Sequence, residues 1–378
     1  MQGPDAKVFV PKDIIRCDPE TDLDWIIAKT FFMVAHAQVH QQNVHLFTHL
    51  IMEPFVVAME RQLPLVHPVR KLLYHHVVGT VSINTFGRTN LIIDGGQADV
   101  CMSTGGGGYL TMMHNFYRNG TVGAISEEGG LSFYKRYNHA KFCQSRNVHL
   151  NEKLPNYRYR DDGLLVWNAM EQYTTNFLKL HYKSDEAVKD DRELNQWVYD
   201  VKHEGLRNHC SDFKEKLEKL DELIELVTVI MFTMSCGHAA VNFSQWDAYA
   251  HIPTCPMAAM KPPPTQHDRN PWDFGDYLDM LPTIPMIKEQ LESASLPSSF
   301  NIADLYLTGP FPDYVFTSLE ELAVVKSFND EMIGFDNALK EQNEKVRDSL
   351  KEHSMSLEAS GDVYEYLLPS RVPCSIAV

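Results

Sequence analysis

Leu220-Asp-Glu-Leu-Ile-Glu-Leu-Val-Thr-Val-Ile-Met-Phe-Thr-Met-Ser-Cys-Gly-His-Ala-Ala-Val-Asn242 is the stretch of this 378-residue sequence that says most about its fold. Its apolar residues recur at steps of three and four, the period of one buried face of an α-helix. They are Leu220, Leu223, Ile224, Val227, Met231 and Met234. The same steps continue to His238 and Asn242. Because unpartnered polar side chains are costly to bury, these two must be bonded or ligated. The stretch predicts a core helix over about residues 219–245 with functional side chains at its end.

A second long helix is predicted from near Asp22 to about Gln62, where Pro64 and Pro68 end it. It carries histidines at positions 36, 40, 45 and 49. Residues four apart on a regular helix differ by only ~40° in direction, whereas residues five apart differ by about 140°. The pairs His36/His40 and His45/His49 are therefore better placed to chelate a metal than His40/His45. A wider π turn, frequent at functional sites, would instead bring residues five apart onto one side. Taken alone, the cluster fits either a metal site or hydrogen-bonded core histidines.

The rest of the sequence is also mostly helical in pattern. A strong helix is expected after Asp161-Asp162-Gly163, and Ser318-x-x-Glu321 is a capping box that opens another long helix. Gly105–Gly108 is expected to form a flexible turn, and residues 253–285 are rich in loops. No alternating βα pattern occurs. The expected fold class is therefore mainly α, with a few short strands, in one domain over residues 1–378.

Composition excludes several kinds of partner. The formal net charge is −16, which argues against nucleic acid and against docking on anionic membranes. No run of about 20 apolar residues is present, so no transmembrane segment is expected. Seven scattered cysteines without a Cys-x-x-Cys pair fit reduced thiols, and the start, Met1–Lys7, lacks an apolar signal region. A cytoplasmic location is expected.

Several long motifs resemble lipoxygenases. They are His40-Gln-Gln-Asn-Val-His45-Leu-Phe-Thr-His49, Tyr159-Arg-Asp-Asp-Gly-Leu-Leu-Val-Trp167, His238-Ala-Ala-Val-Asn-Phe-Ser-Gln245 and the closing Val372-Pro-Cys-Ser-Ile-Ala-Val378. The resemblance covers nearly the whole chain in order. It implies the C-terminal portion of the helical catalytic domain of that family, without its N-terminal β-sandwich and first catalytic helices. Peripheral membrane docking would need that missing β-sandwich.

The resemblance also implies a set of metal ligands. One non-haem iron would be bound by His40, His45, His238, Asn242 and the terminal carboxylate of Val378. Gln245 would be a hydrogen-bond partner that orients a ligand, and no catalytic group is expected beyond an iron-bound hydroxide. Imidazole, amide oxygen and carboxylate together suit iron better than zinc. No His-Glu-x-x-His motif of a zinc peptidase occurs.

Two features depart from the family pattern: the stretch from His45 to His49 is one residue short, and the terminal residue is Val378 in place of the usual isoleucine. If the family spacing is counted forward from Trp25, His40 and His45 fall at the ligand positions, and the deletion lies just after His45. If the family spacing is counted back from His49, Val39 and Val44 fall at the ligand positions, and valine cannot bind iron.

The implied activity is insertion of O2 into polyunsaturated fatty acids, which gives hydroperoxides. Gly87 aligns with a position where glycine accompanies R products, since it leaves space for O2 at a different carbon. The alternative explanation for Gly87 is a structural one, a turn glycine with unusual backbone angles. Ile83 and Leu91 would share the face of Gly87 on a helix and line the pocket, although ordinary core packing is nearly as good an explanation. The alternative function is a truncated, non-catalytic lipoxygenase remnant that binds fatty acid or a partner protein.

Overall fold

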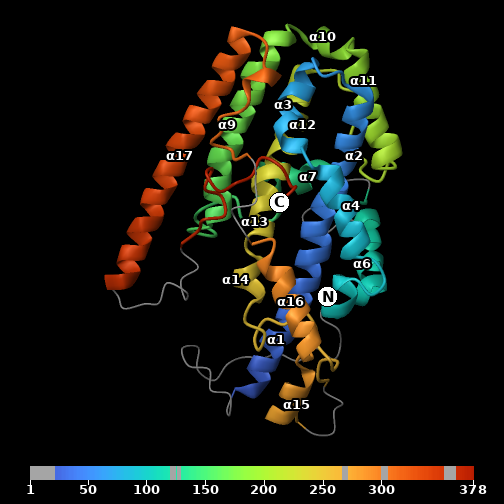
Figure 1. Cartoon of the computed structure of the whole chain (residues 1–378), viewed down its shortest axis with the longest axis vertical. Coiled ribbons are helices and arrows are strands. Elements are labelled where there is room, and N and C mark those ends of the chain that lie inside the picture. The colour runs from blue at the N-terminus through green and yellow to red at the C-terminus, as the bar shows by residue number, and fades with distance from the viewer. Residues whose placement is uncertain (1–21, 120–124, 126–128, 266–270, 299–304, 353–362) are drawn as a thin grey trace. The chain divides into compact units, whose positions relative to one another are not determined.

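The structure, a computed structural model, describes residues 22–119, 125, 129–265, 271–298, 305–352 and 363–378 (Figure 1). Helices form nearly all of its regular structure, which confirms the prediction of a mainly α fold. In place of short strands, these residues contain two isolated β-bridges, Ile125 with Leu131 and Tyr306 with Pro373. The segment Met1–Lys7 and Cys17 lie outside the described residues. The other six cysteines are free thiols, as predicted.

The chain divides into two compact units. Unit 1 comprises Met1–Leu46, Phe86–Met113 and Ser244–Ser299, and unit 2 comprises Phe47–Thr85, His114–Phe243 and Phe300–Val378. Each unit has its own buried apolar clusters. That residues 1–378 act as one domain stays a prediction.

Unit 1 is built from short helices and one longer one. Its elements are α1 (Leu23–Gln38), the π-helix η1 (Val39–Leu46), the end of α4 (Thr80–Asn90), α5 (Gln97–Cys101), most of α6 (Gly105–Asn119), α14 (Gln245–Tyr249), α15 (Phe274–Met280) and α16 (Ile284–Ser295). Helix α16 packs against α5 and α14. The prediction of a turn at Gly105–Gly108 was wrong, because α6 begins there. The Asp99 carboxylate accepts the N–H of Gly106 and stabilises that helix start.

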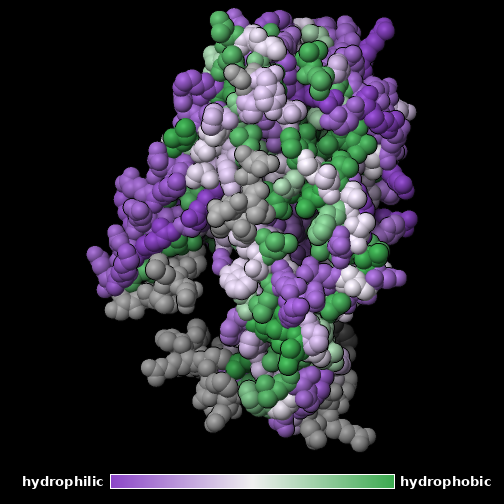
Figure 2. Space-filling model, viewed as in Figure 1, coloured by the Kyte–Doolittle hydropathy of each residue, from purple (hydrophilic) through white to green (hydrophobic). Residues whose placement is uncertain are grey.

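Unit 2 holds the larger core. Its elements are α2 (Phe47–Gln62), α3 (Pro68–Val77), most of α4, the end of α6, α7 (Phe133–Tyr137), α8 (His139–Ser145), α9 (Arg158–His181), α10 (Asp185–Lys189), α11 (Arg192–Asp200), η2 (Val201–Gly205), α12 (Leu220–Phe232), η3 (Thr233–Gly237), α13 (His238–Asn242), η4 (Asp313–Val315) and α17 (Leu319–Glu352). Helix α9 packs against α12 and α17 (Figure 1). The outer surface of α17 is hydrophilic (Figure 2) and carries exposed ion pairs such as Lys326–Asp330.

The helix predicted over 219–245 is confirmed in outline but is not regular. Five residues of π-helix, η3, separate α12 from α13. Leu223, Val227 and Met231 of the predicted face are fully buried. The predicted capping box is also confirmed, since Ser318 Oγ accepts the N–H of Glu321 at 3.1 Å and Glu321 Oε2 accepts the N–H of Ser318 at 3.3 Å.

The stretch Leu220–Tyr249 is long and apolar enough to cross a membrane by length and composition alone. The share of its most apolar window that is buried is 78%, as in the core helix of a folded protein. It is therefore weak support for a membrane span.

Buried histidines should make this fold sensitive to acid. Burial lowers the pKa of His75 and His139 to about 4 and that of His76 to about 3. The unfolded chain binds these protons near pH 6.5, so stability is fully present above that pH and is lost as the pH falls toward 4. We expect protonation of each histidine on unfolding to lower the free energy of unfolding by about 2 kcal/mol between pH 7 and pH 5. Urea unfolding at both pH values measures this loss, and equal stabilities would contradict it.

Candidate metal centre

Two histidines of unit 2 face each other at the centre of the candidate site. His49 lies in the first turn of α2 and His238 begins α13, and their Nε2 atoms are 2.8 Å apart. The side chains are buried, with 9% and 1% exposure. Because two nitrogen lone pairs repel at this distance, a proton or a cation must lie between them. Two nitrogens each about 2.1 Å from one metal, at about 90° to each other, lie about 3.0 Å apart, so the spacing suits a shared metal.

His49 is held so that a lone pair is available at Nε2. Its Nδ1 lies 2.9 Å from Oδ1 of Asn84, and burial lowers its pKa to about 4, against the raising effects of the Asn84 bond and of Glu53. The ring is therefore neutral near pH 7. A neutral imidazole whose Nδ1 bears the proton is the form that ligates through Nε2.

The other predicted ligands of unit 2 are Asn242 and Val378, and their role as ligands stays a prediction. Asn242 lies one helical turn after His238 on α13 and is 1% exposed. The C-terminal tail is not free in solvent, since Val372, Cys374 and Ile376 are buried and Val378 packs against the unit 2 core. His76 Nδ1 donates to the Cys374 carbonyl at 2.9 Å, and Ser375 Oγ donates to the Val78 carbonyl at 2.6 Å.

A glycine makes room for this tail. Gly79 has φ +76°, and a Cβ there would meet the Cβ of Ala377 at 2.6 Å. Only glycine combines that backbone conformation with so close an approach. The turn between α3 and α4 thus contacts the C-terminal tail and leaves space for it.

The predicted ligands of unit 1 lie in η1, the π-helix that the five-residue spacing required. His45 Nδ1 lies 3.2 Å from Gln245 Nε2 and 3.5 Å from Gln41 Oε1. Gln245 Oε1 accepts from Gln41 at 2.7 Å, so its Nε2 donates to His45 Nδ1. That Gln245 orients a metal ligand stays a prediction. His40 Nδ1 bonds the Tyr249 hydroxyl at 2.7 Å, and that hydroxyl also contacts His36 Nδ1 at 3.0 Å.

The predicted stereocontrol residues are on or next to α4. Ile83 and Gly87 are in the helix, and the Leu91 N–H bonds the Gly87 carbonyl at 2.9 Å just past its end. Gly87 is buried and does not have positive φ, so the alternative of a turn glycine is wrong. An added Cβ would meet Leu91 Cδ1 at 3.9 Å, an ordinary contact.

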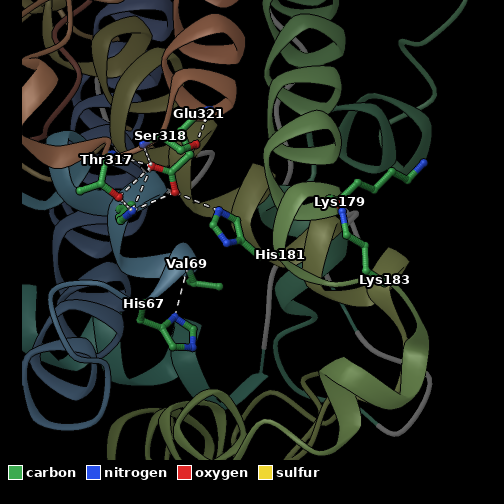
Figure 3. Close-up of polar contacts among 9 residues, drawn as sticks. His67, Val69, Lys179, His181, Lys183, Thr317, Ser318 and Glu321 are labelled. Carbon is green, nitrogen blue, oxygen red and sulfur yellow. Dashed lines mark hydrogen bonds and ion pairs between the residues drawn. The ribbon is translucent and has the colours of Figure 1, made fainter.

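A second cluster of potential ligands, His67, Asp191 and Glu193, is explained without a metal. The Val69 N–H donates to His67 Nδ1 at 3.2 Å, so the ring proton is on Nε2 (Figure 3). That Nε2–H points at Asp191 Oδ2, 3.2 Å away, and Tyr182 donates to the same oxygen at 2.6 Å. Although burial opposes it, these bonds lower the pKa of Asp191 to about 2. The cluster ties the start of α3 to the start of α11.

Comparison with known proteins shows what this arrangement belongs to. The sequence matches the model of the family described as Lipoxygenase over residues 2–359. The chain belongs to the lipoxygenase family. This agrees with the resemblance of its motifs and with its helical fold.

Among lipoxygenase relatives, the allene oxide synthase-lipoxygenase protein of Plexaura homomalla is 32% identical over 381 residues, covering 100% of this chain and 32% of that protein. The anaerobic crystal structure of "delta413-417:GS LOX in complex with arachidonate" matches with TM-score 0.85 and 30% identity, over 100% of this chain and 51% of that one. A coral 8R-lipoxygenase structure matches with TM-score 0.82 and 31% identity, over 96% of this chain and 52% of that one. The chain thus spans between a third and about half of these relatives.

His49 is the main residue that the lipoxygenase resemblance did not select. The signal for it was present, because the four-residue spacing from His45 already marked the pair as better chelators than His40/His45. Asn84 and His76 had no such signal, since their partners lie 35 and 298 residues away in sequence.

Proposed function

We propose that this chain binds one non-haem iron through His49, His238, Asn242 and the Val378 carboxylate. His45 stays in the proposal on its spacing alone, because it precedes His49 by four residues. His40 is the alternative that the forward count from Trp25 selects. The observation that carries the proposal is the buried His49–His238 pair, 2.8 Å apart, with the Nδ1 of His49 bonded to Asn84.

We further propose that the activity is that of a lipoxygenase, insertion of O2 into a polyunsaturated fatty acid to give a hydroperoxide. Bound iron would supply the one-electron oxidation that removes a hydrogen atom from the methylene between two double bonds. The protein residues would hold the metal and fix its surroundings. Because the imidazoles are neutral and only one ligand is a carboxylate, part of the positive charge of the cation would not be neutralised by the protein. Burial of His238 and Asn242 keeps bulk water from the ligands.

The experiment is to load the protein with Fe(II), measure iron per chain, and follow O2 uptake and hydroperoxide with arachidonate. Stoichiometric iron with hydroperoxide formation supports the proposal. Stoichiometric iron without hydroperoxide would favour the non-catalytic remnant, and absence of bound iron would contradict both the ligand set and the activity.

Gly87 should control product stereochemistry. The coral 8R-lipoxygenase that this chain resembles carries the R description in its own name, and glycine here leaves space that a methyl group would fill. We expect Gly87→Ala to shift the product from R toward S, because the added methyl group fills the space through which O2 would reach the carbon that gives the R product. The fold should stay intact, since the added Cβ makes only an ordinary contact with Leu91. Chiral chromatography of the reduced product measures the ratio. Unchanged R product from an active, folded variant would contradict this role.

A further inference from the structure

Asn84 lies between two residues of the neighbouring helix α2. It is 4% exposed, and its Oδ1 is 2.9 Å from His49 Nδ1. Its Nδ2 donates to the His49 carbonyl at 3.0 Å and to Glu53 Oε2 at 3.2 Å. One amide side chain from α4 thus contacts the ring and the backbone of His49 and the carboxylate one turn further along α2.

These contacts allow only one orientation of the amide. Rotating it by 180° would place Oδ1 against the His49 carbonyl and the Glu53 carboxylate, both of which are acceptors. The same rotation would place the NH2 group against His49 Nδ1. The Glu53 carboxylate and the His49 carbonyl therefore fix Nδ2 on their side and Oδ1 on the side of the ring.

The fixed amide in turn fixes the ring. An amide oxygen only accepts, so His49 Nδ1 must donate to it, and Nδ1 must bear the proton of the neutral imidazole. Nε2 then carries a lone pair, and that lone pair faces His238 Nε2 at 2.8 Å.

We infer that Asn84 is a positioning residue that sets the tautomer and orientation of His49 for metal binding, and that Glu53 holds Asn84 in place. The metal-binding half of this inference rests on the proposed function, whereas the tautomer does not. Without the Asn84 oxygen, the Nε2–H tautomer is no longer disfavoured, and that form cannot ligate through Nε2. Loss of a residue that orients a metal-bound histidine typically lowers metal affinity 10- to 100-fold.

The test begins with the wild-type chain free of metal. Nitrogen-15 NMR of labelled histidine, with His49 assigned from its substitution, distinguishes a protonated Nδ1 from a protonated Nε2. We expect Nδ1–H for His49. An Nε2–H tautomer in the folded wild-type protein would overturn the inference whatever metal it binds.

Three variants separate this role from a merely structural one. Asn84→Ala removes the acceptor and should increase the Nε2–H form and weaken Co(II) binding 10- to 100-fold. Asn84→Asp keeps an acceptor for Nδ1 while losing the amide donor, so it should retain the Nδ1–H tautomer. Ser82→Ala, on the exposed face of the same helix, should change neither readout.

The outcomes also separate this inference from the proposed function. If Asn84→Ala and Asn84→Asp lose Nδ1–H equally, or if Asn84→Ala keeps it, the inference fails while metal binding can stand. If the wild-type shows Nδ1–H but binds no Co(II) or Fe(II), the proposed function fails and the role of Asn84 is confined to the tautomer. Thermal unfolding of each variant confirms that a folded protein is compared.

Discussion

Replacing His49 with leucine should lower the affinity for Fe(II) or Co(II) by more than about 100-fold, because losing a ligand should exceed the 10- to 100-fold effect of losing a residue that only orients one. The ring it removes contributes one of two nitrogens that lie 2.8 Å apart. His238→Leu should have the same effect. Isothermal titration of the metal-free protein with Co(II) measures both losses.

His40→Leu is the matched comparison, because it decides between the ligand set proposed here and the set that the forward count from Trp25 selects. If His49 is a ligand and the His40 ring is instead held by Tyr249, His40→Leu should retain most of the Co(II) affinity. The forward count from Trp25 predicts the reverse. A severe loss in His40→Leu with normal binding in His49→Leu would therefore contradict the ligand set proposed above.

The second large effect is expected from Lys71→Met, which should destabilise the fold by about 3–5 kcal/mol. Lys71 Nζ lies 2.8 and 3.0 Å from the two carboxylate oxygens of Glu321, and both side chains are almost fully buried, at 5% and 2% exposure. Removing the lysine leaves a buried carboxylate without its main counter-charge. The pair links α3 to the start of α17.

Other groups also contact the Glu321 carboxylate (Figure 3). Glu321 also accepts from the backbone N–H groups of Thr317 and Ser318, and His181 Nε2 lies 3.0 Å from its Oε1. Burial alone would raise the pKa of Glu321, but Lys71 and then the backbone N–H groups of Thr317 and Ser318 lower it below its ordinary value. In Lys71→Met the largest contribution that lowers this pKa is lost while the carboxylate stays buried, which is why the loss of stability should be large.

The matched control is Lys326→Met on the same helix, because the Lys326–Asp330 pair is exposed. An exposed pair contributes about 1 kcal/mol or less, so urea unfolding should show little change. Equal effects of the two substitutions would mean that burial does not set the strength of the Lys71–Glu321 pair.

The helical fold could be predicted because its signals are local. Apolar spacing located the buried face of α12, and the Ser318–Glu321 capping box located the start of α17 within one residue. The start of α6 could not be predicted in this way. Gly105–Gly108 has the composition of a turn, and a contact that stabilises its helical form, the Gly106 N–H donated to the Asp99 carboxylate, comes from another segment.

The candidate site could be predicted only in part, for a related reason. The histidines, Asn242 and the terminal carboxylate are recognisable in the sequence, but a single missing residue leaves the register of the histidine helix ambiguous. Local π-helix at η1 and η3 shifts side-chain directions in a way that regular periodicity does not encode. Asn84 is one of many asparagines in the sequence, and its role depends on its hydrogen bonds to His49 and Glu53 of α2.

The most direct test is a crystal structure of the iron-loaded protein with anomalous data collected at the iron absorption edge. A single peak about 2.0–2.3 Å from the Nε2 atoms of both His49 and His238, the range typical of nitrogen ligands by analogy with zinc, is the predicted result. A peak bound by His40 and not by His49, or an empty His49–His238 pair in protein that contains stoichiometric iron, would contradict it.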